Sequence, residues 1–156
     1  MAYEITPETL ALSEALESLL AAAEVQDELS DDDAERLYAL AYKALMADEF
    51  AVADQLLGFL QLFRPAEPHI MAAHAQALRG LGRPEQALGM RTMALMVDGG
   101  SPEHLFALGE DLVAGNDRAT ARDVFQLCAD AAAEPEFNRL RERAQAMVAL
   151  LAHHAN

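Results

Sequence analysis

The side chains best suited to chemistry are one cysteine, five histidines and a run of three aspartates. Cys128 could be a nucleophile, histidines could ligate zinc, and Asp31–Asp33 could hold calcium. The spacing supports none of these. The chain has no glycine-rich phosphate loop, no nucleophile elbow and no paired-cysteine metal signature. His69, His74 and His104 have no partners at metal-ligand spacing, and the remaining two histidines end the chain.

The cysteine and the aspartate run each have a simpler structural explanation. Cys128 occupies a position that is otherwise filled by small or apolar residues, so a packed free thiol is favoured over a nucleophile. The aspartates precede a helical pattern, and carboxylates stabilise a helix N-terminus through its dipole. We therefore expect Asp31–Asp33 to start a helix near Ala34. No catalytic residue, no metal and no cofactor are predicted.

The composition predicts an all-α protein. The chain has 156 residues, enough for one domain, and is 53% hydrophobic but only 6% aromatic. Its apolar residues are mostly alanine and leucine, which favour closely packed helices, whereas sheets favour β-branched residues. Isoleucine occurs only at Ile5 and Ile70.

The charge narrows the possible partners. The formal net charge is −15, and the first 35 residues contain eleven acidic side chains and no Lys or Arg. Binding to nucleic acid or to an anionic membrane needs basic clusters, so both are predicted to be absent. A basic partner is possible, although solubility is the simpler explanation. One cysteine and no apolar run of about 18 residues predict a cytoplasmic protein.

Residues 34–135 repeat with a period of 34, in blocks 34–67, 68–101 and 102–135. Small or apolar residues recur at fixed positions of each block, and turn-forming residues recur at position fifteen. The columns hold Leu37, Met71 and Leu105 at position four; Ala41, Ala75 and Gly109 at position eight; Ala44, Leu78 and Leu112 at position eleven; Asp48, Gly82 and Asn116 at position fifteen; Ala53, Ala87 and Ala121 at position twenty; and Leu60, Ala94 and Cys128 at position twenty-seven.

This is the period of tetratricopeptide repeats, each of which is an antiparallel helix pair. We predict three such pairs forming a right-handed superhelix. Residues 1–33 form an acidic N-terminal segment with a helix over about 9–24, and residues 136–156 form a C-terminal capping helix and tail. His74 and Arg91 depart from the pattern, so the middle repeat is either packed more loosely or serves a ligand, although degenerate positions are common in natural repeats.

The repeat register also assigns a concave face to the first helix of each pair, a surface suited to an extended peptide. Tyr38 and Tyr42 are four residues apart and share this face. Their alternative role is packing between repeats. The predicted groove residues are Glu35, Tyr38, Tyr42, Leu45, Met46, His69, Ala72, Gln76, Arg79, Phe106 and Glu110.

The span from about 29 to 150 resembles the class II chaperones of bacterial type III secretion, which protect translocator proteins. The resemblance rests on the combined layout of five segments rather than on one diagnostic motif. These segments are Leu37–Tyr42, Phe50–Ala53, Gly82–Ala87, Met96–Pro102 and Leu105–Leu112.

The resemblance implies a cytosolic chaperone without ATPase activity. It would hold a short, proline-containing segment near the N-terminus of a translocator in the groove and would need no cofactor. The family's groove aromatics correspond to Tyr38, Tyr42 and Phe50, while Leu45 stands where relatives often have another aromatic. The leading helix implies a homodimer, with contacts from Leu12, Leu16, Leu19 and Leu20.

Two other functions fit the same sequence. A repeat scaffold could bind a folded partner, such as a transcription activator, and some relatives of the chaperones are thought to do this. An accessory subunit of an enzyme is the third possibility, which the residues neither support nor exclude.

Overall fold

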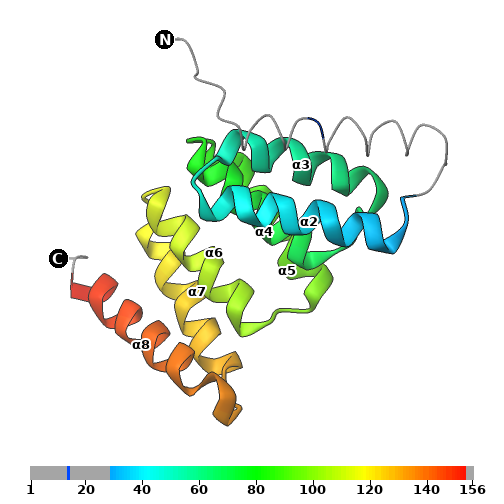
Figure 1. The fold of residues 1–156 in the computed structure, drawn as a ribbon. Coiled ribbons are helices and arrows are strands. Elements are labelled where there is room, and N and C mark those ends of the chain that lie inside the picture. The colour runs from blue at the N-terminus through cyan, green and yellow to red at the C-terminus, as the bar shows by residue number, and fades with distance from the viewer. Residues whose placement is uncertain (1–13, 15–28, 154–156) are drawn as a thin grey trace.

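The described residues form a stack of helices. The computed structural model describes Glu14 and residues 29–153. Within the latter range the chain folds into α2 (Asp31–Met46), α3 (Phe50–Phe63), α4 (Pro68–Gly80), α5 (Pro84–Asp98), α6 (Pro102–Ala114), α7 (Arg118–Ala131) and α8 (Asn138–His153), with no strand among them (Figure 1). Successive helices pack as antiparallel pairs, and α8 packs mainly on α7. The predicted all-α class is therefore confirmed for this part of the chain.

The turn inside each pair has the same geometry in all three repeats. Asp48, Gly82 and Asn116 adopt positive φ angles of 57°, 71° and 64°. In each case the next residue donates its backbone N–H to a carbonyl five residues earlier, at 2.8 to 2.9 Å. This is the Schellman ending, which needs a residue that tolerates the left-handed conformation. Position fifteen therefore marks the end of the first helix in each repeat.

The helix starts differ slightly from the prediction. Helix α2 begins at Asp31 rather than near Ala34, because the Ser30 hydroxyl accepts a hydrogen bond from the backbone N–H of Asp33 at 3.2 Å. The three aspartates thus form the first turn instead of preceding it, where they face the positive end of the helix dipole. The last helix begins at Asn138, after a 3-10 turn over Pro135–Phe137.

The repeat columns are buried. Positions eight, twenty and twenty-seven carry side chains that are almost completely inaccessible, among them Ala41, Ala53 and Cys128 at 0% exposure. Gly109 shows why the residues at position eight are small. A Cβ placed on it would lie 2.6 Å from the ring of Phe125 in the partner helix. Glycine is required there because the third repeat has an aromatic ring at position twenty-four.

The apolar core is divided into two clusters. The N-terminal cluster comes from α2, α3 and α4 and includes Leu37, Leu57 and Ile70. The C-terminal cluster comes from α6, α7 and α8, with Leu88 and Leu95 of α5 packed against it. The two helices of the middle repeat therefore belong to different clusters, and the contacts of α4 and α5 hold the stack together.

Candidate binding groove

The irregular residue of α4 is a tightly held histidine. His74 is buried, and its ring nitrogens lie 2.7 Å from Asp54 Oδ1 and 3.0 Å from Gln61 Oε1, both on α3. Arg83, at the start of α5, also reaches Asp54 at 3.4 Å. A buried imidazole needs such partners, because an unsatisfied polar group in the interior is costly. His74 therefore connects the first repeat to the second.

The irregular residue of α5 belongs to a second polar network. Arg91 is buried, and its Nε donates to Asp111 Oδ2 of α6 at 2.9 Å. Arg79 Nη1 of α4 donates to the other carboxylate oxygen at 3.0 Å, and Arg91 Nη1 donates to the carbonyl oxygen of Ala72 at 3.2 Å. Both departures from the repeat pattern are therefore hydrogen-bonded across repeat boundaries, His74 to the first repeat and Arg91 to the third.

An aromatic group lies at the N-terminal end of the face formed by α2, α4 and α6. The rings of Tyr38 and Tyr42 have centroids 6.4 Å apart, and the rings of Tyr38 and His69 form an edge-to-face pair with centroids 4.9 Å apart. Tyr42 is 50% exposed, whereas Tyr38 is partly buried. Burial, together with neighbouring Tyr42, raises the pKa of Tyr38, so its hydroxyl stays protonated and can donate a hydrogen bond.

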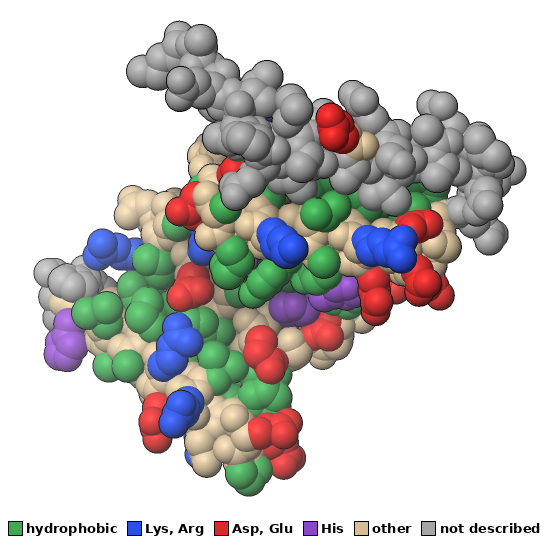
Figure 2. Space-filling view, in the orientation of Figure 1, with side chains coloured by type: hydrophobic (Ala, Val, Ile, Leu, Met, Phe, Trp, Pro, Cys, Tyr) green, Lys and Arg blue, Asp and Glu red, His purple; other side chains and the backbone are tan. Residues whose placement is uncertain are grey.

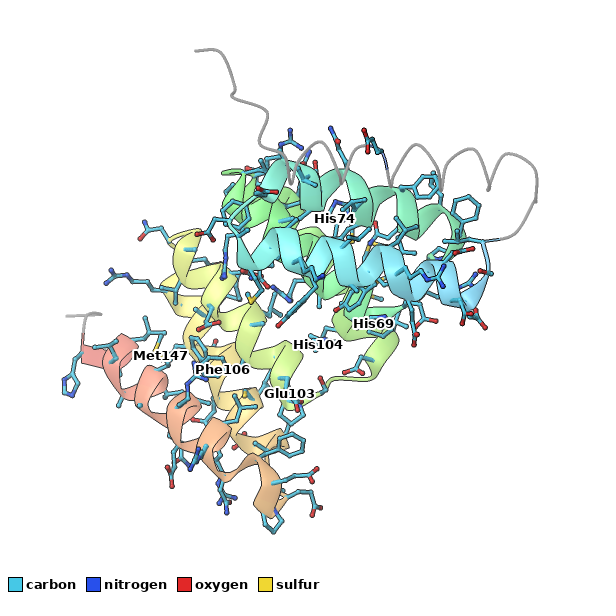
Figure 3. The ribbon with its side chains drawn as sticks, viewed as in Figure 1. His69, His74, Glu103, His104, Phe106 and Met147 are labelled. Carbon is cyan, nitrogen blue, oxygen red and sulfur yellow. The ribbon has the colours of Figure 1, made fainter. Side chains whose placement is uncertain are left out.

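A cleft of about 220 Å³ lies beside these rings. Its apolar surface comes from Ala34, Tyr38 and Ile70, and its rim is charged. The other lining residues are Asp31, Glu35, Arg64, Glu67 and His69. Figure 3 places His69 and His104 in the space between α2 and α6, and Figure 2 shows hydrophobic, histidine and acidic side chains gathered on this face. The predicted residues Glu35, Tyr38 and His69 thus line one cleft.

The middle of the face is more polar. Ala72 and Gln76 are partly buried on α4. Arg79 on the same helix is exposed and contacts Asp111 of the second polar network. Met46 is 63% exposed at the end of α2. On α6, Glu110 is exposed and lies 3.8 Å from Arg143 of α8. A segment crossing this face would meet aromatic, polar and charged surfaces in turn.

Three predicted groove residues offer little surface. Leu45 is only 2% exposed and belongs to the N-terminal cluster, so its prediction as an accessible groove residue is wrong. Phe106 is 6% exposed, because the guanidinium of Arg143 lies 4.4 Å above its ring and Phe125 packs on its edge at 5.2 Å. Phe50 packs against the N-terminal cluster and over Gly80. Leu45 and Phe106 are therefore buried beneath the face, and Phe50 is partly buried at the start of α3.

The register did not identify two residues that complete this face. Asp111 sits at position ten of its repeat, where the first two repeats have Lys43 and Ala77. This column therefore has no common residue type that could place Asp111 in the interior. Arg143 belongs to the capping helix, outside the 34-residue period, so no column could place it against Phe106. Figure 3 shows Phe106 and Met147 where α6 and α8 meet.

The residues that were candidates for chemistry have structural surroundings. Cys128 is buried, its thiol lies 3.2 Å from the carbonyl oxygen of Pro102, and burial raises its pKa, with Glu103 adding to the effect. His104 lies in the first turn of α6, with Nδ1 3.2 Å from Asp98. Among the described residues no group of three His, Cys, Asp or Glu side chains could hold a metal. In the same part of the chain, no helix is long and apolar enough to cross a bilayer.

The predicted dimer contacts Leu12, Leu16, Leu19 and Leu20 lie outside the described residues. The predicted N-terminal helix over about 9–24 lies outside them as well, apart from Glu14.

Solved structures similar to this one share a single architecture. PcrH, whose structure is a complex with the chaperone-binding region of PopD, is 25% identical with a TM-score of 0.76, covering 82% of this chain and 97% of that one. PcrH from Pseudomonas aeruginosa without a named partner is 26% identical with a TM-score of 0.73, covering 80% and 95%. The type III secretion translocator chaperone SycD from Yersinia enterocolitica is 21% identical with a TM-score of 0.75, covering 82% and 89%.

This is the fold of the type III secretion translocator chaperones. The translocator-chaperone fold spans nearly the whole of each of these structures and about four-fifths of this chain. No family model and no curated protein matches the sequence. The low identity is compatible with a shared fold because the repeat columns constrain the size of residues more than their identity.

Proposed function

We propose that this protein is a translocator chaperone of a bacterial type III secretion system. The observation that carries the proposal is the similarity to PcrH, whose structures include complexes with the chaperone-binding regions of PopD and PopB, at 25% and 27% identity. The client of this chain is then a hydrophobic translocator protein, which the chaperone keeps soluble before export. An extended, proline-containing segment near the N-terminus of the client is the part held.

The face formed by α2, α4 and α6 supports this proposal. Tyr38, Tyr42 and His69 provide apolar and aromatic surface beside a cleft, as a site for peptide side chains requires. Aromatic rings contribute a large contact area at a small entropic cost. SycD, which shares the fold at 20% identity, is known in complex with a peptide of the translocator YopD.

Binding of this kind needs neither catalysis nor a cofactor. Because each chaperone molecule masks one client segment, the activity depends on stoichiometry and affinity rather than on turnover. We propose accordingly that the protein is not an enzyme and acts in the bacterial cytoplasm, where translocators are made.

Co-expression tests the proposal. The tagged full chain is expressed with each translocator encoded beside its gene, and the soluble complex is purified and digested by a protease. We expect co-purification and a protected client segment near the translocator N-terminus. Failure of every adjacent translocator to co-purify, while the chaperone remains helical, contradicts the proposed function.

We further propose a homodimer formed through Leu12, Leu16, Leu19 and Leu20. An apolar stripe of this kind is a natural self-complementary interface, and one structure of SycD is described as an alternative dimer. Sedimentation of a Leu16→Glu, Leu19→Glu variant tests it. Loss of the dimer is expected, and a dimer that persists unchanged excludes these residues from the interface.

A further inference from the structure

Arg79 occupies an unusual place on the α2–α4–α6 face. Its side chain is 40% exposed, yet one terminal nitrogen is fixed at 3.0 Å from the carboxylate of Asp111, whose own side chain is only 3% exposed. Asp111 is in turn held by Arg91 on its other oxygen at 2.9 Å. The guanidinium is therefore anchored from the interior while part of it faces solvent.

The network carries an uncompensated positive charge. It contains two arginines and one carboxylate, so its formal charge is +1. Arg91 donates to Asp111 and to the carbonyl oxygen of Ala72, and its side chain is only 7% exposed, so a ligand cannot reach it. A guanidinium has five N–H donors, and Arg79 makes no other hydrogen bond with residues 29–153 than the one to Asp111. The excess charge therefore lies at the exposed edge of Arg79.

We propose that Arg79 binds a carboxylate of the client, an aspartate or glutamate within the extended segment. A planar guanidinium with free donors pairs with a carboxylate through two parallel hydrogen bonds. A neutral carbonyl would satisfy one donor but would leave the charge uncompensated. The inference rests on the proposed function, because it concerns the same groove.

A preference for an acidic client residue is not what the overall charge of the protein would predict. The whole chain carries a net charge of −15, and the cleft at the other end of α4 is lined by Asp31, Glu35 and Glu67 together with Arg64. Acidic peptides should be repelled by this protein in general. Screening limits such repulsion to about 8–10 Å, so the local charge of Arg79 decides the preference at its own position. Arg91 and Asp111 act here as positioning residues, since they fix the fork of Arg79 without reaching the client.

A selection with random peptides tests the proposal. A pool of displayed 15-residue peptides is selected on the full-length protein and, in parallel, on Arg79→Gln. The matched control is Arg122→Gln, which removes an arginine of similar exposure, 45%, whose partner within residues 29–153 is the adjacent Asp123 on α7. Peptides selected on the parent protein and on Arg122→Gln should share one Asp or Glu at a fixed spacing from their apolar residues. Peptides selected on Arg79→Gln should lack this acidic residue.

Affinity measurements then isolate the pair. Replacing the acidic residue of a selected peptide by its amide should weaken binding to the parent protein about tenfold and should leave binding to Arg79→Gln unchanged. Arg79→Lys, which keeps the charge but loses the fork, should fall between the two. The peptide substitution leaves the protein untouched, so the result stands even if a protein variant folds poorly.

The outcomes separate this inference from the proposed function. Selected peptides without a fixed acidic residue, or the same sequence preference on Arg79→Gln, overturn the carboxylate site, while translocators still co-purify if the proposed function is correct. If adjacent translocators fail to bind the parent protein, the proposed function fails, whatever the peptides show. A pool that yields no binders on the parent protein contradicts both.

Discussion

The two boundaries of the middle repeat differ in how they are held. At the first boundary, α4 contributes Ile70, Ala73 and Ala77 to the N-terminal cluster, and the polar contacts centre on His74, which pairs with Asp54 and Gln61. At the second boundary, α5 contributes partly buried leucines, and the buried Arg91–Asp111 pair completes the contact with α6. Asp54 keeps a side-chain exposure of 24%, whereas that of Asp111 is 3%. The first boundary is mainly apolar, and the second depends on a buried ion pair.

This difference shows that irregular positions in a repeat can carry the contacts between repeats. His74 and Arg91 replace residues that would normally fill the core with apolar groups. Each of these side chains instead contacts a carboxylate on the adjacent repeat. A buried pair adds little net stability compared with apolar packing, but breaking it is costly because a charge is left unpaired.

The largest expected effect is therefore at the second boundary. Asp111→Ala leaves the buried guanidinium of Arg91 without its carboxylate, and we expect a loss of about 3–5 kcal/mol in the free energy of unfolding. Asp54→Ala is the matched change at the first boundary and should cost about 1 kcal/mol, since Asp54 is partly solvated. Urea unfolding followed by circular dichroism measures both. Equal losses would show that the two boundaries are held in the same way.

Removing both charged partners sharpens the same comparison. Arg91→Leu combined with Asp111→Leu eliminates the buried charges together, so the double variant should be more stable than Asp111→Ala by at least about 1 kcal/mol. At the first boundary, His74→Leu introduces the residue type that Leu40 and Leu108 provide at the same position of the other two repeats. This substitution should leave the free energy of unfolding nearly unchanged. A double variant less stable than Asp111→Ala would argue against an unpaired charge as the cause.

The next effect concerns helix contact inside a repeat. Gly109→Ala places a Cβ 2.6 Å from the ring of Phe125 and should cost about 1–3 kcal/mol in the free energy of unfolding. The control is Gly89→Ala on α5, where nothing lies within 4 Å of the added Cβ, and which should stabilise the protein by roughly 0.5–1 kcal/mol.

A second substitution tests the reason for that cost. The first repeat pairs Ala41 at position eight with Leu57 at position twenty-four. Adding Phe125→Leu to Gly109→Ala recreates this combination in the third repeat. The double variant should lose less stability than the sum of the two single variants. Strict additivity would mean that the two positions do not share space.

The smallest expected effect is a pH dependence at the start of α7. Asp117 accepts a hydrogen bond from the backbone N–H of Thr120 at the start of α7. Hydrogen bonding to the Thr120 side chain first, and to its backbone N–H second, lowers the pKa of Asp117. A carboxyl with a lowered pKa stabilises the fold above its unfolded pKa, near 4, and this contribution is lost as the pH falls through the folded value.

Asp117→Asn keeps an oxygen acceptor but does not titrate. The difference in melting temperature between parent and variant should shrink as the pH falls from 6 to 3. The equivalent residues Glu49 and Arg83 make no such bond in the first two repeats. A constant difference between parent and Asp117→Asn over this range would rule out Asp117 as the titrating group.

The columns predicted the fold because size and turn geometry repeat with the period. Position fifteen is Asp48, Gly82 and Asn116, three residue types that tolerate positive φ, and all three have it. The helix N-terminus near Asp31 was misplaced by three residues because a serine that caps a helix looks like any other polar residue before one. Periodicity determines the interior, but the cap depends on one side-chain bond.

The face was harder to predict because exposure depends on neighbours outside the period. Tyr38, Tyr42 and His69 come together as their register indicates. Phe106 has the same kind of register position but is covered by Arg143 from α8. Leu45 is instead packed within the N-terminal cluster. The 34-residue repeat pattern cannot predict contacts between a repeat and a helix outside the period.

The affinity of a translocator segment for the groove tests the central claim most directly. Calorimetric titration should show that Tyr38→Ala, Tyr42→Ala weakens binding by at least about 2 kcal/mol, roughly thirtyfold, with helix content unchanged. Met96→Ala, Leu127→Ala removes exposed apolar groups from the second helices and should bind like the parent protein. Parental affinity in the tyrosine variant, or loss of binding only together with loss of helix content, would contradict peptide binding by the α2–α4–α6 face.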